Sequence, residues 1–242
     1  MNRSKNAKAL PRIVLIGGGV HAAVVADCIG ASAKARAVGY IDRDGHDPSH
    51  MRRMGLPYLG ADDRVAGLIA DGTISAAVLG MAGLNHRGLR PDLVADLDEV
   101  VPIWWTAIHA TATVAESAEV GPGAVVFARA VINPLARIGR HAVINTAAVI
   151  EHHCEIEDFA VVSPSVTLCG GVRVGRGAFL GAGAVVITDL RVGAGSVVGA
   201  GAVVVRDVPE NVTVVGNPAR VLEHPAGFDA VEVVSRYASF DE

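Results

Sequence analysis

The chain contains 242 residues, of which 51 % are hydrophobic, 19 % charged and only 4 % aromatic, and its formal net charge is −4. This hydrophobic content excludes an intrinsically disordered chain, and the acidic balance excludes the basic surface of a nucleic-acid-binding protein. No apolar run approaches the roughly 18 residues that cross a membrane, so we expect no membrane partner. The 28 glycines and the few rings predict a core of small aliphatic side chains.

Three cysteines, Cys28, Cys154 and Cys169, are odd in number and lack the paired spacing of disulfide frameworks or zinc sites. The apolar run after the basic N-terminus covers only residues 13–16, which is too short for the core of a secretory signal. We therefore expect a reduced, cytoplasmic protein.

The first 107 residues alternate strand patterns with helical patterns. Apolar runs at residues 12–16, 38–42 and 75–80 predict strands. A helical pattern follows the first of these runs, and another surrounds Pro91. Because such alternation is typical of a parallel sheet flanked by helices, residues 1–107 are predicted to form a Rossmann-like βαβ domain.

A glycine-rich turn lies between the first predicted strand and its helix. Gly17, Gly19 and Ala22 form a GxGxxA pattern, whose glycines let backbone amides approach a phosphate at a helix N-terminus. Asp42 ends the next predicted strand, where an acidic side chain can reach a ribose hydroxyl. The alternative is a tight turn without a ligand. A dehydrogenase is disfavoured because the rest of the chain is occupied by a repeat.

This six-residue repeat fills the second half of the chain. From Ile108 to Val204, each of the seventeen positions spaced by six residues is Ile, Val or Leu, and a mostly small residue stands four positions later. The pattern predicts a parallel β-helix in residues 108–222, with three hexads in each coil and nearly six coils. A sandwich or barrel would show a period of two with variable turns. The spacing alone does not determine the hand of the coil.

A histidine pair lies on the predicted outer surface of the β-helix. Ile150 and Cys154 occupy inward positions of one hexad, so His152 and His153 between them point outward. Cys154 is expected to pack as a small hydrophobic residue rather than to carry an acyl group. An outward histidine titrates near neutral pH and suits a general base, whereas the alternative is a solvated surface patch.

The hexads, the segment INTAAVIEHHCEI (residues 144–156) and the closing VVGNPARVL resemble the hexapeptide-repeat acyltransferases. With its short N-terminal domain, the chain resembles the bacterial nucleotide-linked 4-amino-sugar N-acetyltransferases of surface-glycan synthesis and the related sialic acid O-acetyltransferases. The resemblance implies a left-handed parallel β-helix and a homotrimer. It also implies acetyl-CoA as the co-substrate, a nucleotide-linked amino sugar as the acceptor, and no metal.

The resemblance further implies roles for individual residues. His152 aligns with the general base, and Gly170 is placed to offer its N–H to the thioester carbonyl. His153 replaces the family's Glu or Asp, which leaves Glu151 and Glu155 as candidates for that carboxylate role; His153 itself is grouped with the substrate-binding residues. The other expected substrate-binding residues are Gly17, Gly19, His21, Asp42, Gly80 and Asn145. The residues expected along CoA are Ala182, Gly199 and Ala200.

Three other functions fit parts of this pattern. The same site could acetylate a sugar hydroxyl, and acceptors that carry an amine or a hydroxyl distinguish the two reactions. A non-catalytic trimeric binding scaffold is the second alternative. The third is a zinc-dependent carbonic anhydrase, which holds its metal through three histidines at β-helix interfaces. No three-ligand spacing is evident among the histidines of the repeat region, His109, His141, His152 and His153.

Two segments flank the repeat. The adjacent Trp104 and Trp105 precede the first hexad and are expected to pack the domain junction rather than to line the acceptor cleft. Residues 223–242 leave the hexad pattern and form a C-terminal tail. This tail is expected to cap the open end of the β-helix or to be partly disordered.

Overall fold

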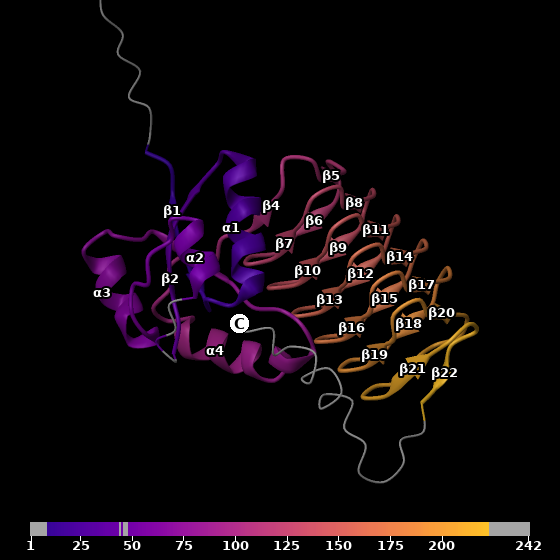
Figure 1. The fold of residues 1–242 in the computed structure, drawn as a ribbon. Helices are drawn as coiled ribbons and strands as arrows, with labels where there is room; N and C mark the ends of the chain where they lie inside the picture. Colours follow the sequence, from indigo (N-terminus) through magenta and orange to yellow (C-terminus); the bar gives the residue numbers. More distant parts are fainter. Residues whose placement is uncertain (1–8, 44, 46–47, 223–242) are drawn as a thin grey trace, which may run out of the picture.

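The computed structural model describes residues 9–43, 45 and 48–222. Two parts follow each other along the chain: a small sheet with helices, and a stack of coils that extends away from it (Figure 1). The predicted tail, residues 223–242, lies outside the described residues. The fold thus agrees with the predicted α/β domain followed by a β-helix.

The N-terminal part is built on a parallel sheet with the strand order β2-β1-β3. Ile13 and Leu15 of the central strand pack with α1, whereas Val14 and Ile16 pack with α3 and α4. The strands are continuous apolar runs because helices cover both faces of the sheet. The elements are β1 (Arg12–Ile16), α1 (Val20–Ser32), β2 (Arg36–Ile41), α2 (Ser49–Arg53), α3 (Val65–Ala70), β3 (Ala76–Leu79) and α4 (Leu89–Leu97).

Two differences from the sequence prediction concern the ends of elements and short elements. The second strand spans Arg36–Ile41 rather than 38–42, so Asp42 directly follows it. The sequence carries no signal for α2, because five residues complete little more than one turn and show no helical periodicity. Pro91 lies in the first turn of α4, where its missing N–H leaves no helical hydrogen bond unmade.

The second part is a three-sided parallel β-helix, in which successive strands lie on three faces in turn. In the described part of the chain, seventeen two-residue strands, β4 to β20, coincide with the seventeen predicted hexads. Strands of neighbouring coils pair in parallel eighteen residues apart, for example Val143 with Val161 and Val149 with Thr167. Each coil therefore holds three hexads, as predicted.

The strands are grouped by face. The eight-stranded face comprises β4 (Ala107–Ile108), β7 (Val125–Val126), β10 (Val143–Ile144), β13 (Val161–Val162), β16 (Phe179–Leu180), β19 (Val197–Val198), β21 (Thr213–Val215) and β22 (Arg220–Val221). The six-stranded face comprises β5 (Thr113–Val114), β8 (Val131–Ile132), β11 (Val149–Ile150), β14 (Thr167–Leu168), β17 (Val185–Val186) and β20 (Val203–Val204). The five-stranded face comprises β6 (Glu119–Val120), β9 (Arg137–Ile138), β12 (Glu155–Ile156), β15 (Arg173–Val174) and β18 (Arg191–Val192).

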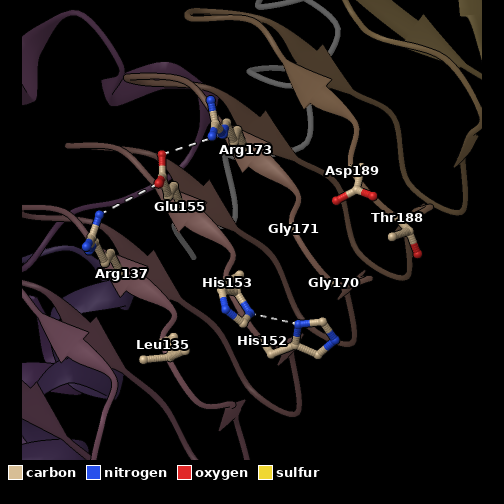
Figure 2. A pocket seen from close by; sticks show the side chains of 10 residues that line it. All are labelled: Leu135, Arg137, His152, His153, Glu155, Gly170, Gly171, Arg173, Thr188 and Asp189. Carbon is tan, nitrogen blue, oxygen red and sulfur yellow. Dashed lines mark hydrogen bonds and ion pairs between the residues drawn. The ribbon is translucent and has the colours of Figure 1, made fainter.

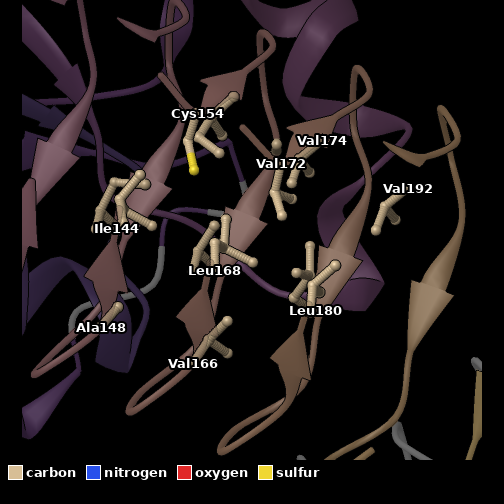
Figure 3. Close-up of a cluster of buried hydrophobic side chains, with 14 of the residues drawn as sticks. Ile144, Ala148, Cys154, Val166, Leu168, Val172, Val174, Leu180 and Val192 are labelled. Atoms are coloured by element: carbon tan, nitrogen blue, oxygen red, sulfur yellow. The ribbon is translucent and has the colours of Figure 1, made fainter. Parts of the chain in front are cut away.

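The interior of the β-helix is a narrow column of small aliphatic side chains (Figure 3). The second residue of each two-residue strand points inward, as Ile144, Leu168 and Val174 do from the three faces. Cys154 fills an angle between two faces, and burial raises the pKa of its thiol to about 11. It therefore stays protonated and packs as a small hydrophobic residue, as predicted.

The first residue of each strand points outward, and the parallel register stacks outward residues of successive coils into columns. The three columns differ in chemistry. The eight-stranded column is apolar and is buried beneath the N-terminal domain at Ala107, Val125, Val143 and Val161. The six-stranded column is largely aliphatic and half-buried at Val131, Val149, Thr167, Val185 and Val203. The five-stranded column is charged at Glu119, Arg137, Glu155, Arg173 and Arg191.

The closing segment VVGNPARVL ends the stack. Here β22 returns antiparallel to β21, at the edge of the eight-stranded face. Several corners of the coils carry non-glycine residues with positive φ, among them Leu135 (64°) and His153 (60°). The coils are consistent with the left-handed β-helix that the family resemblance implies.

The junction between the two parts is built around a buried arginine. Arg90 of α4 is only 1 % exposed, and it donates from Nη1 to the carbonyl of Phe159 (3.0 Å) and from Nη2 to the carbonyl of His141. The indole of Trp104 is buried against the ring of His141, and Trp105 packs against the cluster that contains α1. Both tryptophans thus pack the domain junction, as predicted.

The same junction makes stability depend on pH. The ring of His141 stacks on Phe159, and neither of its nitrogens has a partner among the described residues. Burial, with Arg140 and Arg90 nearby, lowers its pKa from 6.5 to about 3. The folded chain therefore binds fewer protons than the unfolded chain between these pH values. The contribution of the neutral His141 ring to the free energy of unfolding is therefore complete above pH 6.5, and it is lost progressively as the pH drops toward 3.

Acidification from pH 7 to pH 5 is expected to lower the free energy of unfolding by about 2 kcal/mol through His141 alone. A His141→Phe variant keeps an apolar ring between Trp104 and Phe159, but this ring has no proton to bind. Its free energy of unfolding should therefore fall less than that of the wild type over the same pH change. Urea unfolding at the two pH values measures this difference. Equal losses in both proteins would contradict the assignment.

Candidate active site

Two corners of the β-helix carry the predicted site residues of the repeat. The corner between the six-stranded and five-stranded faces, called here the histidine corner, comprises residues 151–154, 169–172 and 187–190 of successive coils. The corner between the eight-stranded and six-stranded faces, called here the asparagine corner, comprises residues 145–148, 163–166, 181–184 and 199–202. Because the six-stranded face separates the two corners, one chain does not bring their residues together.

The histidine corner contains a gap in its column of side chains. Gly170 and Gly171 lie in the coil between the two histidines and Asp189 (Figure 2). A Cβ added to Gly170 would lie 2.6 Å from Cε1 and 2.8 Å from Nε2 of His152, so the imidazole rests over this glycine. A Cβ added to Gly171 would collide with the carboxylate of Asp189. The gap belongs to a cavity of about 620 Å³, which His152 and His153 also line.

The two histidines contact each other through their rings. Nδ1 of His152 lies 3.0 Å from Nδ1 of His153, so one nitrogen donates a hydrogen bond and the other accepts it. The candidate carboxylates are engaged elsewhere. Glu151 accepts the backbone N–H of His152 (3.4 Å), and Glu155 forms ion pairs with two arginines of the five-stranded face (3.8 and 3.7 Å). The side chain that contacts the His152 ring is therefore His153, and neither Glu151 nor Glu155 takes this place.

The backbone of Gly170 offers a hydrogen-bond donor to the cavity. Its N–H has no acceptor among the described residues, whereas the N–H groups of Cys169 and Gly171 donate to carbonyls of neighbouring coils. A fixed N–H beside an imidazole can stabilise an oxyanion while the imidazole takes a proton. The arrangement has the two groups that acyl transfer from a thioester needs.

The hexad pattern does not single out three charged residues of this cavity, Arg137, Arg173 and Asp189. Arg137, Glu155 and Arg173 are spaced by eighteen residues and form one column on the five-stranded face. His153 and Asp189 lie two coils apart at equivalent corner positions. The signal that identifies these residues is thus the period of a full coil rather than the period of a hexad.

The asparagine corner holds the other predicted residues of the repeat. Asn145 is half-buried, and its Oδ1 accepts the N–H of the following residue (2.7 Å). Ala182 lies exposed two coils further on, and Gly199 and Ala200 follow in the next coil. These residues leave a strip with little side-chain bulk, which the backbone of a ligand can approach closely.

The glycine-rich turn lies at the carboxyl edge of the N-terminal sheet, as predicted for the loop after a parallel strand. Gly17 has a positive φ of 99°, which favours glycine. Gly80 has no space for a side chain, because an added Cβ would lie 2.5 Å from the carbonyl oxygen of Gly17 and 2.9 Å from Cβ of Ala22. These glycines therefore allow two chain segments to meet closely at the sheet edge.

Asp42 joins this turn to the next strand. Its Oδ2 accepts the N–H of Gly18 (2.8 Å), and a cavity of about 180 Å³ lies between Gly17, Asp42 and His86. The N–H groups of Gly19 and Val20, at the start of α1, have no acceptor in the described parts of the chain. They are available to an anionic group at the helix N-terminus.

His21 lies at the domain junction rather than in the cavity near Asp42. Its ring meets Phe127 edge-on at 5.4 Å, and burial, with Arg90 and His86 nearby, lowers its pKa to about 4. It is therefore neutral at neutral pH. Phe127 and Asn145 occupy the same position in successive coils, so the contact of His21 brings the start of α1 beside the asparagine corner.

The described residues contain no group of three or more metal-binding side chains. His109, His141 and His152 lie on three different corners of the β-helix. None of the helices described here is both long and apolar enough to span a bilayer.

Known proteins resemble the chain in both parts. Residues 12–79 match the PglD N-terminal domain family. One solved structure is the GDP-perosamine N-acetyltransferase of Caulobacter crescentus, a histidine-to-alanine variant in complex with CoA and GDP-perosamine. Its sequence is 35 % identical to this chain, and the match covers 89 % of this chain and 99 % of that chain, with a TM-score of 0.81. The PglB acetyltransferase domain of Neisseria gonorrhoeae, solved with acetyl coenzyme A, is 29 % identical over 88 % of this chain and 100 % of that chain, with a TM-score of 0.79. No curated protein matches significantly.

Proposed function

The chain belongs to the hexapeptide-repeat sugar N-acetyltransferases, and on this premise we propose that it transfers the acetyl group of acetyl-CoA to the amine of a nucleotide-linked amino sugar. The observation that carries the proposal is the imidazole of His152 resting over Gly170, whose N–H is free of acceptors among the described residues. The ligands bound to the two relatives, CoA with GDP-perosamine and acetyl coenzyme A, support the choice of substrates.

The chemistry assigns one task to each group at the histidine corner. The amine nitrogen attacks the thioester carbonyl carbon, and Nε2 of His152 accepts the proton that the amine loses. The carbonyl oxygen gains negative charge as the C–N bond forms, and the N–H of Gly170 stabilises it. The C–S bond then breaks, and the CoA thiolate leaves with a proton from the imidazolium.

The nucleotide part of the acceptor is assigned to the N-terminal domain. The free N–H groups of Gly19 and Val20 suit a phosphate, and Asp42 lies at the edge of the neighbouring cavity, where a ribose hydroxyl can reach it. Because His21 brings the start of α1 beside the asparagine corner, a sugar attached to these phosphates extends toward Asn145. The strip of Ala182, Gly199 and Ala200 on this corner is assigned to CoA.

The division of the site between two corners supports a homotrimer. The half-buried aliphatic column of the six-stranded face, Val131 to Val203, lies between the corners and suits contact with another copy. Such a contact joins the histidine corner of one copy to the asparagine corner of the next. Repetition of a head-to-tail contact closes a ring, and three copies form the ring that the family resemblance implies. We also assign the reaction to the cytoplasm, in keeping with three free thiols.

The direct test incubates the full-length chain with acetyl-CoA and UDP-, GDP- or dTDP-linked amino sugars. Release of free CoA thiol together with the acetylated sugar, detected by mass spectrometry, is the expected result. A matched acceptor that carries a hydroxyl in place of the amine tests O-acetylation. Absence of transfer to every amine acceptor would reject the proposal and favour a binding scaffold.

Replacing Gly170 with alanine is expected to lower kcat by about 10²-fold, because the new methyl group displaces the imidazole of His152 from its place while leaving the N–H intact. The KM for both substrates should change little, since the binding strip lies on the other corner. Gly177 is a suitable control, because an added Cβ there meets no atom within 4 Å, although its φ of 63° adds strain. Full activity of Gly170→Ala would contradict the role of this contact.

A further inference from the structure

The ring contact between His152 and His153 carries an inference that rests on the proposed function. The two Nδ1 atoms are 3.0 Å apart, and the ring planes are nearly perpendicular, at 88° (Figure 2). At this distance one nitrogen must carry a proton and the other must present its lone pair, because two lone pairs would repel each other. The pair therefore has two tautomeric arrangements.

The two arrangements differ in whether Nε2 of His152 carries a proton. If His152 donates from Nδ1, its Nε2 is unprotonated and can accept a proton from an amine. If His153 donates instead, the neutral ring of His152 carries its proton on Nε2 and has no base to offer. Only the first arrangement is competent in acetyl transfer.

We infer that His153 is a positioning residue: it accepts a hydrogen bond from the Nδ1–H group of His152 and thereby leaves Nε2 of His152 as the base. The Cε1–Nε2 edge of His152 lies over Gly170, and no described residue accepts a hydrogen bond from Nε2. The Nδ1 edge faces His153, which can serve as an acceptor. Among the described residues, His153 is therefore the only hydrogen-bond partner of the His152 ring, and it lies on the Nδ1 side. A proton held on Nδ1 leaves the lone pair of Nε2 free to act as the base.

The acceptor also stabilises the protonated base. When Nε2 has taken the amine proton, the hydrogen bond from Nδ1 to the neutral His153 becomes charge-assisted and strengthens. The charged groups that face the pair are Glu151 on the same corner, Asp189 two coils further on, and Arg137, Glu155 and Arg173 on the five-stranded face. Glu155 pairs with both arginines, so its charge is offset by its own neighbours.

Two variants separate the acceptor role of His153 from the bulk of its side chain. His153→Asn keeps an acceptor oxygen near the position of Nδ1, has no proton to bind at neutral pH, and tolerates the positive φ of 60°. His153→Leu removes the acceptor. Leucine is accommodated at this corner position, since Leu135 occupies it one coil earlier with a φ of 64°.

In kcat, His153→Asn should remain within about 3-fold of the wild type at pH 8, whereas His153→Leu should fall by about 10- to 10²-fold with little change in KM. Equal kcat values for the wild type and His153→Leu would overturn the inference.

A second readout does not depend on turnover. In ¹⁵N spectra of the histidine-labelled full chain, the neutral ring of His152, identified by its loss in His152→Ala, should carry its proton on Nδ1. His153→Leu should move this proton toward Nε2. A proton on Nε2 in the wild type would refute the inference even if the enzyme is active. Absence of acetyl transfer by the wild type, with the proton on Nδ1, would instead refute the proposed function alone.

Discussion

Replacing His152 with alanine is expected to lower kcat by about 10²- to 10⁴-fold, which is the usual contribution of a general base. The amine nucleophile then loses its proton to water instead of to a fixed imidazole. The KM for acetyl-CoA should stay near the wild-type value, because the strip assigned to CoA lies on the asparagine corner. Steady-state kinetics with the acceptor found in the substrate screen measures both parameters.

His109→Ala is a matched control for this loss. His109 is a partly exposed histidine on the first coil, and its Nδ1 accepts hydrogen bonds within that coil. It has no place in the proposed site, so kcat should be unchanged. Thermal unfolding should be similar for both variants, because His152 lies on the surface and contributes little to the core. Wild-type kcat in His152→Ala would reject the base assignment.

A charge on the six-stranded face is expected to dissociate the oligomer into single chains and, as a consequence, to abolish acetyl transfer. Val149 lies in the middle of the aliphatic column, and Val149→Lys would bury an unpaired ammonium in the proposed contact, at a cost of several kcal/mol. The outward side chain does not enter the core, so the coil should still fold. Sedimentation should show a monomer, and acetyl transfer should fall below detection.

Glu210→Lys introduces the same side chain at an exposed position outside the six-stranded face. The oligomeric mass measured by sedimentation and the rate of acetyl transfer should therefore stay unchanged. A variant of Val149 that stays trimeric, or a monomer that is active, would contradict the division of the site between copies.

Mixed trimers test this division more directly. If the base of one copy serves the acceptor bound by the next, chains with His152→Ala and chains with Asn145→Ala should complement each other. In a randomly mixed ring, about one site in four receives an intact histidine corner from one copy and an intact asparagine corner from its neighbour. About a quarter of the wild-type activity should therefore return. No recovery would indicate that both corners act within one chain.

Several parts of the fold and the site are predictable from local sequence. The period of six gives the inward positions of the β-helix directly, because each hexad is one strand and one corner with the same geometry. Gly17 and Asp42 are also recognisable, since a turn after a strand and the end of the next strand share one edge of a parallel sheet. The outward position of His152 follows from Ile150 and Cys154 in its own hexad.

Other features are not predictable because they depend on residues that meet across coils. Asp189 lies thirty-seven positions from His152 in the sequence, and only the parallel register of the coils brings both to the gap at Gly170 and Gly171. The engagement of Glu155 with two arginines likewise depends on the stacking of one face. Neither relationship is visible within a single hexad.

The class of fold and the small aliphatic core are predictable from the amino-acid sequence, because periodicity is a local property, and the short motifs indicate acyl transfer through their resemblance to a known family. The contact of His153 with the His152 ring and the position of the two corners on opposite sides of an aliphatic face emerge only when the coils stack. Side-chain contacts and the separation of corners depend on rotamers and on the closure of a three-sided coil, which distant residues control together.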